Sequence, residues 1–262
     1  PTPHKHHPRS KLLMAMQYMG PVQISVLVMW SLVFIALLWV IAIFRREARK
    51  DRVISVLYHR VVPDEVWDSF VERERIFSVS ESRFRGQLEW LRDQDYTFLS
   101  MNQLVAHLKG EGAIPPKAAF VSFDDGCESV YSRALPILKE LEIPSTVFVT
   151  TDPETWIFHS GEYHERRMTE DEIRACEEGG IAVESHSVSH RGLNEMSDEE
   201  ALAEMTESKE AITAWIGRPV QYFSIPLNFY NKRTLELCKE AGYSAVCVCD
   251  GATTNASSSP FR

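Results

Sequence analysis

Cysteine is scarce in this chain of 262 residues. There are five cysteines, an odd number that one chain cannot pair completely. None of their spacings matches a zinc knuckle, which excludes the common cysteine-based structural zinc sites. We therefore expect no disulfide framework. A chain of this length allows one large domain plus an appendage.

Basic residues are scarce beyond position 52. Residues 53–262 carry 20 Lys and Arg against 35 Asp and Glu, a net charge of −15. Such a surface repels nucleic acids and other polyanions, so we expect no nucleic-acid partner. It is compatible with a neutral amide substrate whose product gains an amine.

Charged residues are absent from Val22 to Phe44, a run of 23 residues. As a helix this run would be about 35 Å long, enough to cross a hydrocarbon core of about 30 Å. It exceeds the apolar part of a usual signal peptide, and no small-residue cleavage site follows it. We therefore expect one transmembrane helix and a single-pass membrane protein.

The expected helix divides the chain into four segments. These are a polar segment at 1–21, the helix at 22–44, a basic linker at 45–52 and a large domain at 53–262. Three Lys or Arg precede the apolar run and five follow it. This bias favours the cytoplasmic side of the membrane for the large domain.

Within the large domain, short apolar runs alternate with amphipathic segments. Helix starts are marked by capping boxes such as those beginning at Thr169 and Ser197. Strict alternation of strand and helix predicts a parallel sheet covered by helices. The expected strands are Val53–Tyr58, Ala118–Phe123, Ser145–Val149, Ile181–Glu184, Tyr222–Ile225 and Ser244–Cys249.

Two polar motifs follow expected strands. Asp124 and Asp125 come after Ala118–Phe123, and His186 and His190 lie further along the chain, after Ile181–Glu184. Residues i and i+4 of a strand are about 13 Å apart, whereas on a helical turn their Cβ atoms are about 5–6 Å apart. We therefore expect a turn at His186–His190.

These motifs carry the chemistry expected of the chain. One Asp and two His make a three-ligand set for a divalent metal, with positions left open for water and substrate. The other Asp of the pair is then free to act as a general base on that water. The pattern is typical of a metal-dependent hydrolase.

The run from Phe84 to Gly251 resembles the polysaccharide deacetylase (NodB-homology) domain of carbohydrate esterase family four. The resemblance implies that Asp124 is the catalytic base, and that Asp125, His186 and His190 bind a divalent metal, usually Zn²⁺. It also implies an α/β fold, a distorted (β/α) barrel of about seven parallel strands. The matching pieces are Ala118–Gly126, Ala134–Leu138, Ser145–Val149, His186–His190 and Glu240–Tyr243.

One motif departs from the family. Where the family has Arg-x-Pro-Tyr-Gly, this chain has Ser224-Ile225-Pro226-Leu227-Asn228. The arginine that orients the base is thus replaced by Ser224. The resemblance implies that the backbone N–H of Leu227 supplies the oxyanion donor. We do not identify the family's late histidine, its general acid, and we expect the C-terminal end of the domain to be incomplete.

Side chains beside the expected site suggest how a substrate is held. The loop Thr151–Met168 contains Trp156 and Tyr163, whose flat faces suit sugar rings, although such aromatic residues also pack loops onto a barrel. His59 ends the first strand at the same rim and is a further candidate, either for substrate binding or as the acid.

The function that these features favour is a membrane-anchored, metal-dependent carbohydrate N-deacetylase. Its substrate would be an N-acetylated amino sugar in a glycan or a lipid-linked sugar. Two alternatives stay open: a deformylase or amidohydrolase acting on a non-polymeric amide, and a glycan-binding protein with weakened catalysis. The membrane side is also open, since the family more often works outside the cytoplasm.

Overall fold

The computed structural model describes residues 29–30, 32–35, 37–39, 52–152, 158–249 and 254–255. The chain divides into two compact units, Pro1–Lys50 and Asp51–Arg262. The larger unit contains all the expected site residues, of which only Trp156 lies outside the described ranges.

The structure corrects the expectation of a membrane-spanning helix. Most of Val22–Phe44 lies outside the described residues, and its described parts, between Met29 and Trp39, are helical and exposed. A helix needs about 20 apolar residues to cross a bilayer. Among the residues that the structure describes, no helix reaches that length and apolarity. The prediction of a single-pass, membrane-anchored protein is therefore wrong on this finding.

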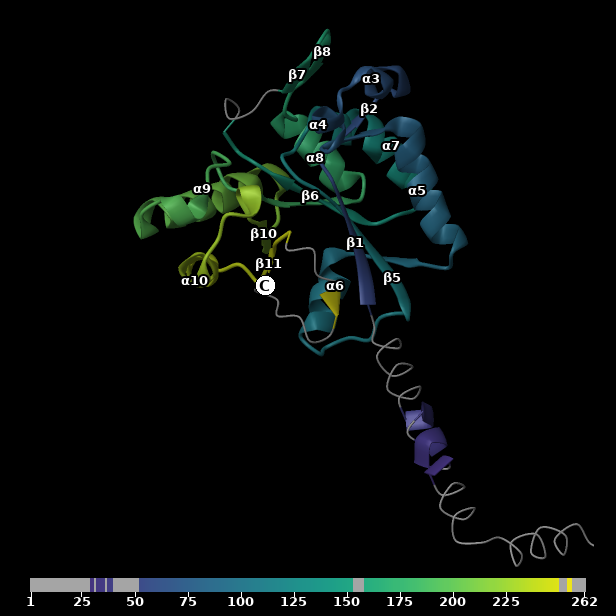
Figure 1. Ribbon diagram of the computed structural model, residues 1–262. Helices are drawn as coiled ribbons and strands as arrows, with labels where there is room; N and C mark the ends of the chain where they lie inside the picture. The colour runs from purple at the N-terminus through teal and green to yellow at the C-terminus, as the bar shows by residue number, and fades with distance from the viewer. Residues whose placement is uncertain are drawn as a thin grey trace, which may run out of the picture. The chain divides into compact units, whose positions relative to one another are not determined.

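The larger unit is an α/β fold (Figure 1). Its strands are β1 (Arg52–Tyr58), β2 (Arg60–Val62), β3 (Ser78–Ser80), β4 (Thr97–Leu99), β5 (Lys117–Phe123), β6 (Ser145–Val149), β7 (Phe158–Ser160), β8 (Tyr163–Glu165), β9 (Ile181–Ser185), β10 (Tyr222–Ser224), β11 (Ala245–Cys247) and β12 (Thr254–Asn255). Its α-helices are α3 (Asp64–Ser69), α4 (Glu72–Arg75), α5 (Glu81–Asp93), α6 (Met101–Leu108), α7 (Leu135–Glu140), α8 (Glu170–Glu178), α9 (Asp198–Ile216) and α10 (Lys232–Glu240). Short turns of other helix types are the π-helical η1 (Val130–Ala134) and the 3₁₀ turns η2 (Leu193–Glu195) and η3 (Pro226–Asn228).

The main sheet runs in the order β11-β10-β9-β6-β5-β1-β12. The six strands expected from the sequence, β1, β5, β6, β9, β10 and β11, are present and pair in parallel. They form a curled half-barrel. Strand β4, which the sequence pattern missed, pairs in parallel with the first half of β5, whereas β6 pairs with its second half. Strand β12 adds an antiparallel edge to β1. Within the described residues β11 and β12 do not pair with each other, so the full barrel of about seven parallel strands is borne out only in part.

The helix starts follow from their capping residues. Ser80, Ser100, Thr169, Ser197 and Asn231 each accept a backbone N–H from the first turn of the helix that follows. Such a contact satisfies one of the four N–H groups that a helix start leaves unpaired. Helix α9 ends at a glycine with φ of 73°, a conformation that side chains with a Cβ rarely adopt. The capping boxes predicted at Thr169 and Ser197 are confirmed.

The core lies on both faces of β5, because successive side chains of a strand point to opposite faces. Val121 and Phe123 pack into one hydrophobic cluster with residues of α5, α8 and α9. Ala118 and Phe120 pack into a second cluster with residues of α6. The sheet is therefore buried on both faces, as a parallel sheet requires.

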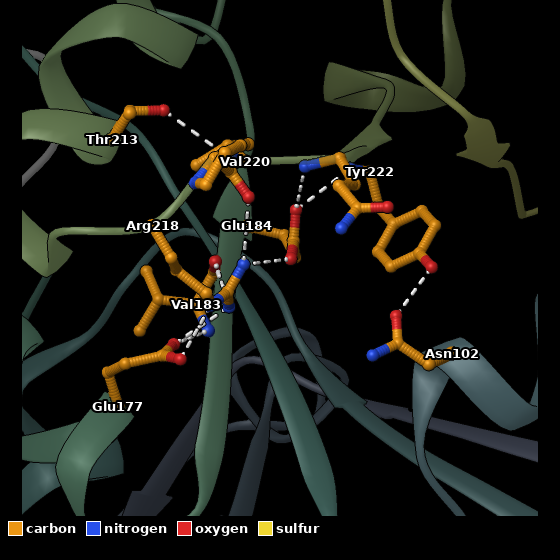
Figure 2. A network of polar contacts seen from close by, with 10 residues as sticks. Asn102, Glu177, Val183, Glu184, Thr213, Arg218, Val220 and Tyr222 are labelled. Atoms are coloured by element: carbon orange, nitrogen blue, oxygen red, sulfur yellow. Dashed lines mark hydrogen bonds and ion pairs between the residues drawn. The ribbon is translucent and has the colours of Figure 1, made fainter.

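A polar network ties β9 to β10 (Figure 2). Glu184 of β9 accepts a hydrogen bond from the Arg218 guanidinium at 2.8 Å and from the backbone N–H groups of Gln221 and Tyr222, each at 2.8 Å. Arg218 also forms a two-pronged ion pair with Glu177 of α8, at 2.6 and 2.8 Å. The network fixes β9 and β10, the two strands that lead into His186 and Ser224.

Candidate metal centre

Most of the expected site residues follow the carboxyl ends of parallel strands of the main sheet. His59 follows β1, Asp124 and Asp125 follow β5, His186 follows β9, and Leu227 lies in η3 just beyond β10. Parallel strands end at one edge of the sheet, so segments far apart in sequence meet there. This is the edge at which β/α barrels carry their chemistry.

Asp125 faces two imidazoles. Its Oδ1 lies 3.2 Å from Nε2 of His190 and 3.6 Å from Nε2 of His186. The Asp125 backbone has φ of 74°, and Gly126 follows with φ of 76°. A Cβ added at Gly126 would lie 3.0 Å from the Val149 side chain, so this turn requires glycine there. The turn explains how adjacent carboxylates point in different directions.

The two histidines are held differently. The Nδ1 of His186 lies 2.8 Å from the backbone oxygen of Ser224. A carbonyl only accepts, so Nδ1 carries the proton and Nε2 presents its lone pair toward Asp125. His186 is 2% exposed, whereas the side chain of His190 is 20% exposed. The turn expected at His186–His190 is present, with ring centroids 4.9 Å apart.

The three side chains fit a divalent metal. One ligand atom each from Asp125, His186 and His190 lies within 4.8 Å of the others. Ligand atoms about 2.0–2.1 Å from a tetrahedral zinc ion stand about 3.3 Å apart, close to the two Asp–His distances observed. One carboxylate and two imidazoles leave room for water and a substrate oxygen at the same ion.

Electrostatics set the protonation of these groups. Burial acts to raise the pKa of Asp125, but the hydrogen bond from His190 and the neighbouring imidazoles outweigh it and lower the pKa. Burial lowers the pKa of His186 to about 4, against the opposing charge of Asp125. An ionised carboxylate and a neutral imidazole are the forms that bind a metal.

Asp124 differs from its neighbour. It is 5% exposed, and burial raises its pKa from 3.8 to about 7, against the opposing influence of His59. Its Oδ2 accepts a hydrogen bond of 3.2 Å from the Ser224 hydroxyl. Its buried Oδ1 has no partner within the described residues. A carboxylate with one free oxygen and a pKa near neutrality is suited to accept a proton.

Ser224 and Arg167 complete the site. The sequence pattern did not predict the contacts that they make. Ser224, noted in the sequence only as a lost arginine, contacts Asp124 through its hydroxyl and His186 through its carbonyl. The guanidinium nitrogens of Arg167 are buried without a hydrogen-bond partner in the described part of the chain. Burial lowers the pKa of Arg167, and the charge of Asp125 acts to raise it. Nothing in the sequence around Arg167 indicated such a position.

The expected substrate residues have mixed outcomes. Trp156 lies outside the described residues. Tyr163 packs against Phe70 and Phe158, with ring centroids 5.9 and 6.4 Å away, and its hydroxyl donates to Glu165. These contacts anchor the β7–β8 hairpin, and a substrate role for Tyr163 stays a prediction.

His59 follows β1 and Leu227 follows β10, at the same edge of the sheet. Burial lowers the pKa of His59, whereas the charges of Asp125 and Asp124 act to raise it, so His59 interacts electrostatically with both carboxylates. Leu227 has φ of 56°, a strained conformation for a residue with a branched side chain. Such strain is typical of functional turns, and the oxyanion role of the Leu227 N–H stays a prediction.

Comparison with known proteins decides the family. The sequence model of the polysaccharide deacetylase family matches residues 111–246, more than half of the chain. This chain belongs to the polysaccharide deacetylase family. The predicted resemblance is confirmed, and so is the assignment to the hydrolases of polysaccharide deacetylase type.

Curated polysaccharide deacetylase relatives cover the chain in part. The protein YxkH of Bacillus subtilis (strain 168) is 26% identical over 165 residues, which are 63% of this chain and 56% of YxkH. The chain thus spans little more than half the length of that relative. The poly-β-1,6-N-acetyl-D-glucosamine N-deacetylase of Staphylococcus aureus (strain MRSA252) is 24% identical over 212 residues, 74% of this chain and 71% of that enzyme.

Solved structures share the fold. The Streptococcus pyogenes deacetylase PplD, in complex with acetate, superposes with a TM-score of 0.67 at 22% identity, covering 79% of this chain and 88% of PplD. IcaB from Ammonifex degensii superposes with a TM-score of 0.62 at 23% identity, covering 76% of this chain and 84% of IcaB. The curled parallel sheet is therefore the polysaccharide deacetylase fold.

Proposed function

We propose that this chain is a metal-dependent N-deacetylase that hydrolyses the acetamide of an N-acetylated amino sugar in a glycan. The observation that carries the proposal is the cluster of Asp125, His186 and His190, with Asp124 next in the chain and not committed to a second partner. Zn²⁺ is the ion that this donor set favours.

The proposed chemistry divides among the residues of the centre. When bound, the ion supplies Lewis acidity that polarises the acyl carbonyl and lowers the pKa of water. Asp124 takes the proton of the attacking water. The backbone N–H of Leu227 donates a hydrogen bond to the carbonyl oxygen as negative charge develops there. His59, which senses both carboxylates, is the candidate to protonate the leaving amine.

A sugar substrate is supported by the surroundings of the centre. The exposed ring of Phe77 packs edge-on against His59, with centroids 5.0 Å apart. Leu227 and Phe229 are exposed beside Pro226. Exposed aromatic rings such as those of Phe77 and Phe229 suit the apolar faces of sugar rings. The name of the staphylococcal relative supports poly-N-acetylglucosamine as the polymer.

The contact of Ser224 bears on the alternative of a weakened, glycan-binding protein. The missing arginine motivated that alternative, but the Ser224 hydroxyl holds Asp124 in the position of a base. The chain therefore retains a means of orienting its base, which supports an enzyme.

The proposal is tested by measuring metal content and acetate release together. His186→Ala and His190→Ala should each lose stoichiometric zinc and should release no acetate from an N-acetylglucosamine oligomer. His159→Ala, which changes an exposed histidine of the β7–β8 hairpin, is the control and should keep both. Unchanged zinc in both site variants would contradict the assignment of the ligands. A non-polymeric acetamide cleaved in preference to the oligomer would favour the amidohydrolase alternative.

A further inference from the structure

The loop that carries the two histidines has a strained backbone. Ser187 and His190 have φ of 72° and 59°, in the left-handed region that side chains with a Cβ disfavour. Two such residues within four positions persist only where the surrounding structure holds them.

Helix α9 supplies the contacts that hold this loop. The Glu204 carboxylate accepts the backbone N–H of Val188 at 2.9 Å, the backbone N–H of Ser189 at 2.8 Å and the hydroxyl of Ser189. One turn further along α9, the Ser208 hydroxyl lies 2.8 Å from that of Ser185, at the start of the loop. Residues four apart share one face of a helix, so α9 contacts the loop and the residue before it through Glu204 and Ser208.

The two histidines depend on these contacts with α9 to different degrees. His186 is buried and is fixed by the carbonyl of Ser224 on β10. His190 is more exposed, and its backbone N–H is held only within the loop, by the Ser187 hydroxyl at 3.0 Å. The position of the His190 ring therefore follows the position of the loop.

We propose that Glu204 is a positioning residue that holds the His186–His190 loop in the conformation required for His190 to reach the metal. The inference rests on the proposed metal site, and it assigns to Glu204 no contact with metal or substrate. Partners that orient metal ligands typically contribute 10–100-fold to metal affinity.

Two substitutions of Glu204 can show whether the length of its side chain or its charge holds the loop. Glutamine has the length of glutamate, and its amide oxygen can accept both N–H groups while its NH₂ donates to the Ser189 hydroxyl, which can reverse its role. Aspartate keeps the charge but is one methylene shorter and cannot reach the loop from the same helix position. Glu204→Gln should therefore preserve the site, and Glu204→Asp should not.

The test is the dissociation constant for Zn²⁺ of the full chain, measured by competition with a chelator. Glu204→Ala and Glu204→Asp should bind zinc about 10–100-fold more weakly than the wild type. Glu204→Gln should stay within about threefold of it. Glu207→Ala, which removes an exposed glutamate of the same helix, should leave affinity unchanged.

Hydrogen exchange in the metal-free chain gives a second readout. The amides of Val188 and Ser189 should lose protection in Glu204→Asp and keep it in Glu204→Gln, which also decides the case if Glu204→Ala does not fold. Wild-type affinity in Glu204→Asp, or equal losses in the Gln and Asp variants, would overturn the inference while leaving the metal site intact. A wild-type chain that binds no zinc would overturn the proposed function as well.

Discussion

Two buried carboxylates, Glu184 near the end of β9 and Asp124 just after β5, have different surroundings. Glu184 is 2% exposed and Asp124 is 5% exposed, and burial raises the pKa of both. Glu184 is matched by a guanidinium and two backbone N–H groups (Figure 2). Asp124 has one hydroxyl on Oδ2 and no partner on Oδ1 within the described residues.

The difference separates a structural acid from a candidate catalytic one. A buried polar atom without a partner costs about 1–3 kcal/mol, so a stable fold normally satisfies it. The network of Glu184 does so and joins α8, β9 and β10. Asp124 keeps one oxygen without a partner among the described residues, and unsatisfied buried acids with shifted pKa values gather at functional sites.

The largest expected effect is on turnover. Asp124→Asn keeps the shape of the side chain but removes its ability to accept a proton, so acetate release should fall about 10²–10⁴-fold. Zinc content should be retained, because the proposed ligands are Asp125 and the two histidines. If Asp124→Asn instead loses zinc while Asp125→Asn keeps it, the roles of the two carboxylates are reversed.

The network around Glu184 predicts that removing Arg218 lowers the stability of the fold. Arg218→Ala removes the cation from Glu184 and leaves a buried negative charge with only backbone donors. We expect the free energy of unfolding to fall by about 3 kcal/mol, measured by urea denaturation. Arg233→Ala is the matched control, because Arg233 forms its ion pairs with exposed Asp198 and Glu240, and its loss should change the stability much less. Equal effects of the two variants would show that the Glu184 network is not special.

The pKa of Asp124 predicts a pH-dependent stability of the metal-free chain. Since this pKa rises from 3.8 to about 7 on folding, the folded chain holds a proton that the unfolded chain has released. The stability that Asp124 contributes is complete below about pH 4 and is lost as pH rises to about 7. His186, whose pKa falls to about 4, acts in the opposite direction below pH 6.5, so the wild-type curve alone mixes the two.

Asp124→Asn isolates this contribution. The unfolding free energy of the variant minus that of the wild type should rise between pH 4 and pH 7, by at most about 4 kcal/mol. The measurement is urea denaturation at several pH values with a chelator present. A difference that does not change with pH would show that Asp124 is already ionised in the folded chain.

The smallest expected effect concerns Ser224. Ser224→Ala removes one hydrogen bond to Asp124, worth about 1 kcal/mol, so kcat should fall about fivefold. Zinc affinity should not change, because His186 is held by the backbone carbonyl of residue 224 and not by its side chain. Weaker zinc binding in this variant would show that the side chain also supports the metal ligands.

Much of the fold follows from local pattern. The apolar runs and capping residues marked six strands and the starts of α8 and α9 to within one or two residues, because these signals are contained in short stretches of chain. Strand β4 has only three residues and no pattern of its own, and it forms because the first half of β5 offers it an edge. The apolar run Val22–Phe44 shows the opposite error, since local hydropathy alone predicted a span that the described residues do not support.

The sequence by itself determined the class of the protein and the types of residue in its centre. Two Asp and two spaced His after apolar runs indicate a metal hydrolase whatever their surroundings. Only the tertiary structure decided how these residues are held. Ser224 reaches Asp124 across 100 positions. Glu204 is one of several glutamates on α9, and only the fold shows that it contacts the His186–His190 loop. Long-range contacts of this kind arise when parallel strands end at one edge and a helix packs over them, and no local pattern records which side chains meet there.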